Sequence, residues 1–360
     1  MRQRLNIPAC VAFVSLAWPL AAAVAREPEK VAAPVATREF SIVGDIPHLD
    51  GNPVKLWGIR WNNALMSPAV TERHVRCLDT VVAHGINLLT VGLQGTNGSF
   101  PSVDAGPNAF LPTGALRADF GKRLEWIIRE ADKRGMVVGI YVLQPRKDQE
   151  LKDEAAVKRA IEETGRFLTE RKLKNVFVNL MHEFSHPVRA DHELLREPDG
   201  AAKKARLTAW FKAVAPDIEA GVCPNHQSGS ADSYPGMEVR FYQEEMPIPS
   251  TGFAVNTETH DNDEPGNEGI FNRFHRESMR KDWERYLGQP RLVMVFHSSH
   301  IEGVTNSAGT GPNPELGGYG TGPSDRGARF FFEWVRDHVG RWEYPHHILD
   351  RTDDAGKKVE

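Results

Sequence analysis

The sequence predicts one α/β domain, a (β/α)8 TIM barrel with an N-terminal β-hairpin and an incomplete helix ring after strands five and six. Three observations lead to this prediction. Apolar segments of strand length alternate with amphipathic segments of helical period, a pattern typical of parallel strands covered on both faces. Eight such strands can be counted, as a TIM barrel requires. The connections after the fifth and sixth strands are too short to contain full helices.

Individual elements follow from local signals along the chain. Asp50-Gly51 is a hairpin turn signal between the apolar segments 40–43 and 54–57. Ser67-Pro68 predicts a helix start, because serine caps helices and proline suits their first turn, and Gly85 predicts its end. We expect further helices at 122–134, 153–171, 269–287 and 326–339. We expect the barrel strands at 55–61, 86–91, 136–143, 175–181, 218–223, 239–243, 253–258 and 292–297.

A doubly wound open sheet is the alternative architecture. That fold favours a glycine-rich phosphate turn after an early strand, and the sequence contains none. The barrel is therefore the preferred interpretation.

The N-terminus has the layout of a secretory signal peptide. Arg2 and Arg4 precede an apolar segment from 7 to 25, which ends in small residues suited to cleavage. A membrane anchor is the alternative interpretation of this segment. We expect residues 1–25 to be removed and the mature protein to be secreted or periplasmic. The remaining boundaries are a linker at 26–37, the barrel at 38–345 and a tail at 346–360.

The composition narrows the classes of partner. The 360 residues are 40% hydrophobic and 26% charged, and no lysine or arginine cluster marks a nucleic-acid surface. No second apolar segment is long enough to span a bilayer. We expect a monomer that binds no nucleic acid, metal or cofactor and, after signal removal, no membrane. Cys77 and Cys223 either pair or remain two buried thiols.

One short motif admits two interpretations. His182-Glu183-x-x-His186, with His192 six residues further on, has the spacing of a zinc metallopeptidase helix with glutamate as general base. Pro187 follows at once and would break such a helix. The β-forming residues 176–178 also lead into the motif without a cap or turn. The preferred interpretation places Glu183 at the carboxyl end of strand four.

That position matters because TIM-barrel active sites lie at the carboxyl ends of the strands. Glu258 ends strand seven in the same way, with Glu244, Glu245 and Glu264 as competing carboxylates. Two carboxylates about 5 Å apart across the barrel could act as acid/base and nucleophile in a retaining glycosidase, and we predict Glu183 and Glu258 for these roles. Strand-end residues expected to contact a sugar are Trp61, Asn62, Gln94, His182, Tyr242 and His297.

The chain resembles the clan of retaining glycoside hydrolases that includes the family 5 cellulases and mannanases. The segments that carry the resemblance are LDGNPVKLWGIRWNN, AHGINLLTVGL, KRGMVVGIYVL, NVFVNLMHEFSHP and GFAVNTETHD. The resemblance implies a carbohydrate substrate, with Glu183 as acid/base and Glu258 as nucleophile. The chain departs from the family pattern at several places. His182 replaces an asparagine that usually binds the sugar 2-hydroxyl, Phe184 replaces a proline, strand two lacks an arginine, and His297 replaces a tryptophan.

Three functions therefore remain open at this level: a secreted retaining glycoside hydrolase, a zinc metallopeptidase, and a carbohydrate-binding barrel without catalysis. Two long loops accompany the site. The acidic loop 260–268 could hold a cation, although a solvated loop is the simpler interpretation. The Gly/Pro-rich loop 303–327 follows strand eight, where it could cover part of a cleft.

Overall fold

The computed structural model describes residues 34–95, 108–145, 147–187, 190–226, 234–243, 246–259, 273–297 and 328–345. From Val35 onward the described residues belong to one compact unit. The predicted signal peptide, the acidic loop 260–268, the loop 303–327 and the C-terminal tail lie outside the described residues. So do Glu244, Glu245 and Glu264.

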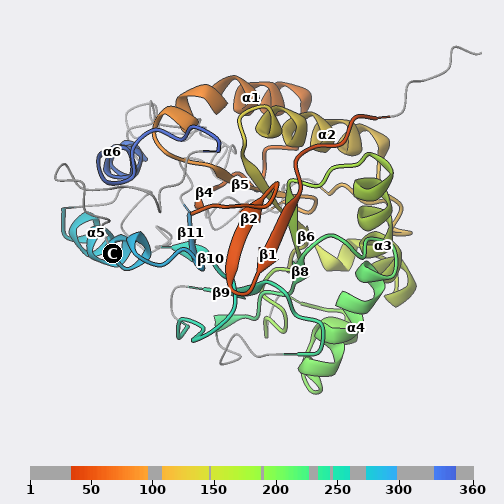
Figure 1. The fold of residues 1–360 in the computed structure, drawn as a ribbon. Coiled ribbons are helices and arrows are strands. Elements are labelled where there is room, and N and C mark those ends of the chain that lie inside the picture. Colours follow the sequence, from red (N-terminus) through yellow and green to blue (C-terminus); the bar gives the residue numbers. More distant parts are fainter. Residues whose placement is uncertain are drawn as a thin grey trace, which may run out of the picture. The chain divides into compact units, whose positions relative to one another are not determined.

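Eight parallel strands form a nearly closed barrel, which confirms the predicted fold (Figure 1). The order around the sheet is β8-β7-β6-β5-β4-β11-β10-β9. The backbone amides of Glu238 and Val239 donate to the carbonyl of Ala220 at 3.2 and 3.3 Å, which brings the edge strands β8 and β9 together. The strands are β4 (Trp57–Arg60), β5 (Leu88–Gly92), β6 (Val137–Leu143), β7 (Val176–Met181), β8 (Ala220–Gly221), β9 (Arg240–Tyr242), β10 (Ala254–Thr259) and β11 (Leu292–Phe296).

Helices lie outside the sheet, and two of them, α1 and α3, begin at residues whose side chains cap them. The Ser67 hydroxyl accepts the amide of Val70 at 3.3 Å, and the Asp153 carboxylate accepts the amide of Ala156 at 2.8 Å. The described residues between β8 and β9, and between β9 and β10, contain no α-helix, in agreement with the incomplete ring. The helices are α1 (Pro68–Ala83), α2 (Ala118–Asp132), α3 (Glu154–Glu170), α4 (Gly200–Lys212), α5 (Arg273–Leu287) and α6 (Arg329–His338), with short 3-10 turns η1 (Asp148–Glu150) and η2 (Glu193–Leu195). Sequence periodicity had not indicated α4.

The N-terminal sheet differs from the predicted hairpin. β1 (Phe40–Val43) pairs with β2 (Ile46–Leu49) and not with residues 54–57, so that expectation is wrong. Gly44 supplies the positive φ of +63° that the intervening turn needs. Asp50-Gly51 does form a turn, but it joins β2 to the two-residue strand β3 (Asn52–Pro53). A proline and a histidine inside β2 hid its strand pattern from sequence reasoning.

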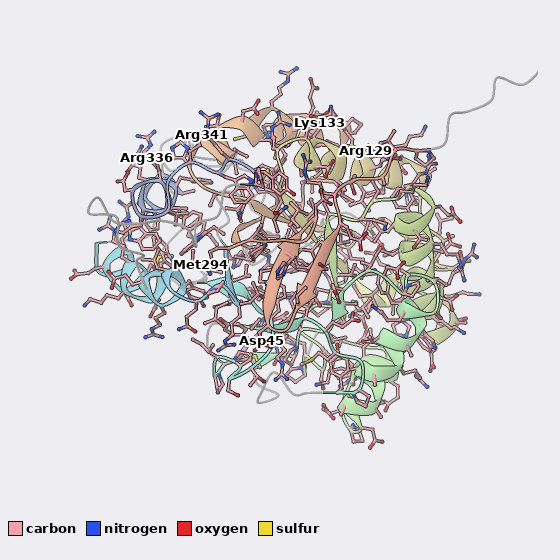
Figure 2. The ribbon with its side chains drawn as sticks, viewed as in Figure 1. Asp45, Arg129, Lys133, Met294, Arg336 and Arg341 are labelled. Atoms are coloured by element: carbon pink, nitrogen blue, oxygen red, sulfur yellow. The ribbon has the colours of Figure 1, made fainter. Side chains whose placement is uncertain are left out.

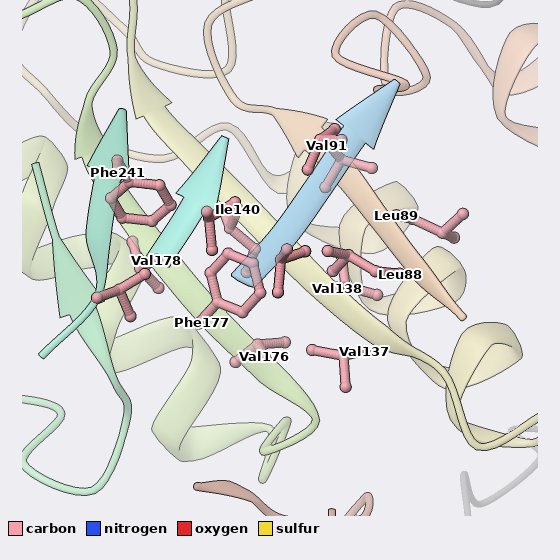
Figure 3. Packing of buried hydrophobic residues seen from close by; sticks show 14 of the residues in the cluster. Leu88, Leu89, Val91, Val137, Val138, Ile140, Val176, Phe177, Val178 and Phe241 are labelled. Carbon is pink, nitrogen blue, oxygen red and sulfur yellow. The ribbon is translucent and has the colours of Figure 1, made fainter. Parts of the chain in front are cut away.

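This small sheet lies at the amino ends of the barrel strands, which we call the barrel floor. The amide of Phe40 donates to the carbonyl of Lys174, just before β7. The Phe40 ring packs against Phe177 and Phe253, with centroid distances of 5.6 and 5.8 Å. Phe177 in turn lies 6.0 Å from Phe241, and Figure 3 shows both rings among the barrel strands. Aromatic side chains therefore fill the barrel from its floor upward.

The outer surface carries most of the charge. Lys133, Arg336 and Arg341 extend from the ribbon into solvent (Figure 2). Cys77 and Cys223 are not joined to each other; Cys223 is buried, as the second predicted alternative requires, whereas Cys77 is only partly buried. Among the described residues, no helix has the length and hydropathy needed to cross a bilayer.

Candidate active site

The two candidate carboxylates lie at the carboxyl ends of the strands, which we call the barrel mouth. Each occupies an irregular position of its backbone. Glu183, two residues past the end of β7, has φ +50°, a left-handed conformation that non-glycine residues rarely adopt. Glu258 lies where the pairing of β10 with β11 shifts register, between Asn256 and Thr259. Irregular strand positions of this kind redirect side chains and are common beside active sites.

Glu258 receives hydrogen bonds on both carboxylate oxygens. Arg60, the last residue of β4, donates from its guanidinium to Oε1 and forms an ion pair there. His182 donates from Nε2 to the same oxygen at 2.9 Å. Gln243, directly after β9, donates from Nε2 to Oε2 at 3.2 Å. Three strands therefore supply the donors that hold one carboxylate.

These contacts set the charge states at the barrel mouth. Burial would raise the pKa of Glu258, but Arg60 and His182 outweigh it and hold the pKa well below its usual range. Burial would lower the pKa of His182, yet the Glu258 carboxylate raises it to about 10. His297 behaves in the opposite way, because burial and the Arg60 charge lower its pKa to about 3. At neutral pH the arrangement holds an anionic Glu258, a cationic His182 and a neutral His297.

Gln243 also connects the two candidate carboxylates. Its Nε2 lies 3.4 Å from Oε1 of Glu183 and 3.2 Å from Oε2 of Glu258. These distances place an upper limit of about 6.6 Å on the separation of the two oxygens, which admits the roughly 5–5.5 Å carboxyl spacing of retaining glycosidases. Glu183 is 9% exposed, and the Glu258 side chain is 19% exposed. Both groups combine hydrogen bonding with partial solvent access.

Other predicted site residues are buried near the mouth with local partners. Asn62 accepts a hydrogen bond from the Thr90 hydroxyl at 3.3 Å. Gln94 donates to the carbonyl of Lys147 at 3.0 Å and accepts the amide of Gln144 at 3.0 Å. Its side chain therefore braces the loops after strands two and three.

Two predicted sugar contacts point the other way. Trp61 is fully buried, and its ring meets the edge of His74 on α1 at 4.7 Å. The Tyr242 hydroxyl pairs with the hydroxyl of Tyr286 on α5 at 3.0 Å. Both side chains pack between barrel and helices, a placement that does not favour their predicted role in sugar contact. The physical reason is strand alternation, since Arg60 and Phe241, their inward-facing neighbours, take the interior positions.

The local backbone contradicts the metallopeptidase interpretation. The segment from His182 to His186 is a turn and not a helix, with positive φ at both Glu183 and Ser185. His182 is paired with Glu258 instead. Nε2 of His192 lies 2.9 Å from the carbonyls of Asp148 and Leu151, where it fastens a loop. Within the described ranges, no three His, Cys, Asp or Glu side chains converge as metal ligands.

Sequence reasoning assigned no site role to Arg60, Gln243 or Tyr141. A buried strand that contains one arginine, WGIR, was a usable signal for Arg60, because such a charge requires a partner. The alternation of β9 was the signal for Gln243, since Phe241 faces inward. Tyr141 lies under His182 with a ring distance of 5.4 Å, and only the folded barrel reveals that contact.

Structural comparison defines the class of fold. No protein-family model and no curated protein sequence matches the chain. Among solved structures, a glycoside hydrolase family 5 protein from Bacteroides vulgatus matches with TM-score 0.52 and 11% identity, covering 76% of this chain and 67% of its own. A β-mannanase from the blue mussel Mytilus edulis matches with TM-score 0.51 and 12% identity over 87% of this chain and 99% of its own.

A family 5 mannosidase from Rhizomucor miehei is similar at TM-score 0.52 and 11% identity, over 84% of this chain and 98% of its own. A second Bacteroides vulgatus structure is longer, and the chain spans 63% of it. At these identities the likeness concerns the fold. The predicted resemblance to the TIM-barrel glycoside hydrolases is therefore confirmed at the level of architecture.

Proposed function

We propose that the protein is an exported glycoside hydrolase that cleaves polysaccharides or oligosaccharides by a retaining, double-displacement mechanism. The observation that carries the proposal is the pair Glu183 and Glu258, which share the Gln243 amide at the barrel mouth. The likeness of the fold to glycoside hydrolases also supports this proposal, although the same fold hosts many chemistries.

Each carboxylate has a surrounding suited to one role. Glu258 is held anionic by Arg60 and His182, so it attacks the anomeric carbon. Glu183 donates a proton to the departing glycosidic oxygen. After the covalent intermediate forms, Glu183 takes a proton from water, and the water's oxygen displaces Glu258 from the same carbon. Two inversions give net retention.

The substrate is a carbohydrate whose identity a panel can establish. Matched structures include a β-mannanase and a β-glucanase in complex with cellotetraose, so β-mannans and β-glucans belong in the first set. The test incubates the purified protein with such glycans and follows product anomers by NMR. A first-formed product with the same anomeric configuration as the substrate supports the proposal. A first-formed product with the opposite configuration contradicts retention.

A carbohydrate-binding barrel without catalysis is the competing outcome. Saturable glycan binding without product formation across the panel would favour it. Export has a separate test, because the mature N-terminus should be Arg26 or close to it after signal-peptidase cleavage. The intact mass of the exported protein measures this directly, and a mass that retains residues 1–25 contradicts the export proposal.

A further inference from the structure

Gln243 reaches the barrel mouth because of the strand that precedes it. In β9, Phe241 faces the barrel interior against Phe177, and Tyr242 faces α5. Alternation therefore turns the next side chain inward again. Gln243 is 3% exposed, so its amide must find hydrogen-bond partners within the protein.

The orientation of the Gln243 amide follows from its neighbours. Its oxygen accepts the backbone amide of His226 at 2.8 Å. A backbone N–H can only donate, so the side-chain oxygen occupies that side and the NH2 group occupies the other. The NH2 group faces Glu183 and Glu258, at 3.4 and 3.2 Å. Both of its protons thus have a carboxylate acceptor.

This geometry points to Gln243 as a positioning residue that bridges the two carboxylates and presents Oε2 of Glu258 for reaction. Arg60 and His182 both bond to Oε1, which occupies that oxygen. Oε2 has one described donor, Gln243, and a second lone-pair direction for bond formation. The inference rests on the proposed function, because it assigns the reactive oxygen of the proposed nucleophile.

The bridge also fixes the spacing of the pair. Each carboxylate is anchored to the same rigid amide, which is itself anchored to the backbone at His226. Small errors in the placement of reacting groups reduce rates strongly, so one amide that positions both groups affects both displacement steps. The role belongs to the residue after Tyr242 and not to Tyr242 itself.

The test compares Gln243→Met, which keeps the length and removes the donors, with Gln243→Glu, which can donate only when protonated. We expect kcat of Gln243→Met to fall about 10- to 100-fold with a smaller change in KM, because hydrogen bonds to charged groups are lost. The acid limb of its pH–kcat profile should move to higher pH. The activity of Gln243→Glu relative to Gln243→Met should be higher at acid pH than at neutral pH.

Gln289→Met is the matched control, because Gln289 is exposed and precedes β11 at the opposite end of the barrel. Its kinetics should equal those of the wild type. If the kcat of Gln243→Met stays within twofold of the wild-type kcat at every pH of the profile, the inference is overturned. Circular dichroism and thermal melting show whether each variant is folded. If Gln243→Met does not fold, the pH dependence of Gln243→Glu tests the inference instead.

A second readout needs no turnover. The side-chain amide signal of Gln243 is the one lost from the NMR spectrum of Gln243→Met. We expect Glu183→Ala to change the chemical shift of one of its two N–H protons and Glu258→Ala to change that of the other. A signal that responds to neither variant overturns the bridge. An inactive wild type with a responsive amide would contradict the proposed function while supporting the bridge.

Discussion

The barrel mouth and the barrel floor each bury a basic side chain, and the pKa of that side chain shifts in opposite directions at the two ends. At the mouth, His182 pairs with Glu258, and despite burial its pKa rises to about 10. At the floor, Lys55 donates to the carbonyls of Gln289 and Leu292 and lies over the ring of Trp57. Burial lowers the pKa of Lys55 to about 7.

The comparison shows that burial alone does not decide the charge of a group. A full counter-charge at hydrogen-bond distance outweighs desolvation at the mouth, whereas carbonyl dipoles and an aromatic face do not at the floor. The mouth therefore retains charge at the pH where chemistry occurs. The floor is dominated by packing, with Phe40, Phe177 and Phe253 in mutual contact.

The largest effect is expected at the mouth, from Glu258→Ala. Loss of the nucleophile should lower kcat by roughly 10⁴-fold or more. Added azide or formate should restore part of the activity by attacking from the vacated side, which steady-state assays with and without the anion measure. Activity near the wild-type level would refute the assigned nucleophile.

Glu183→Ala should have an effect that depends on the leaving group. Loss of general acid catalysis should lower kcat/KM by about 10²- to 10⁴-fold on natural glycans. Activated aryl glycosides should suffer much less in their glycosylation step, because their leaving groups need little protonation. Equal losses on both substrate types would argue that Glu183 does not donate the proton.

At the floor, Phe40→Ala should act on stability and leave the chemistry unchanged. Removal of this buried ring should reduce the free energy of unfolding by about 3–5 kcal/mol. Denaturant unfolding measures the loss, with Phe40→Leu as the milder control. The pH profile of kcat, recorded well below the melting temperature, should match wild type; a shifted profile would mean that floor and mouth are coupled.

His182→Asn should change the pH dependence at the mouth. The folded pKa of His182 is about 10, above the ordinary 6.5, so its stabilising contribution is complete below about pH 6.5 and is lost as the pH rises through 10. The variant should lack this alkaline decline and should show an altered rate with the fold intact. Unfolding at pH 6, 8 and 10 measures it; parallel curves for both proteins would contradict the ion pair.

Lys55→Met should change the pH dependence of stability with the opposite sign. The folded pKa of about 7 lies below the ordinary 10.5, so the cost of the buried charge is complete below pH 7 and is relieved as the pH rises toward 10.5. Wild-type stability should therefore rise relative to the variant across that interval. Stability differences measured from pH 6 to 10 test this, and a difference independent of pH would mean that Lys55 titrates normally.

The sequence by itself determined the architecture and the position of the candidate pair. Serine and glycine signals placed helix ends at Ser67 and Gly85, because caps and positive φ are local requirements. Apolar periodicity placed the eight strands, and strand ends then indicated Glu183 and Glu258. These features depend on a few neighbouring residues, which is why one sequence suffices to predict them.

Only the tertiary structure decided which side chains meet. The turn at Glu183 and the register shift at Glu258 break the alternation that sequence reasoning assumes. Arg60 and Gln243 reach Glu258 from strands far away in the chain, since the closed barrel brings their ends together. Trp61 and Tyr242 face the helices because strand alternation gives the interior positions to Arg60 and Phe241. Burial of a charge requires a partner, and the barrel's closure determines which residue supplies it.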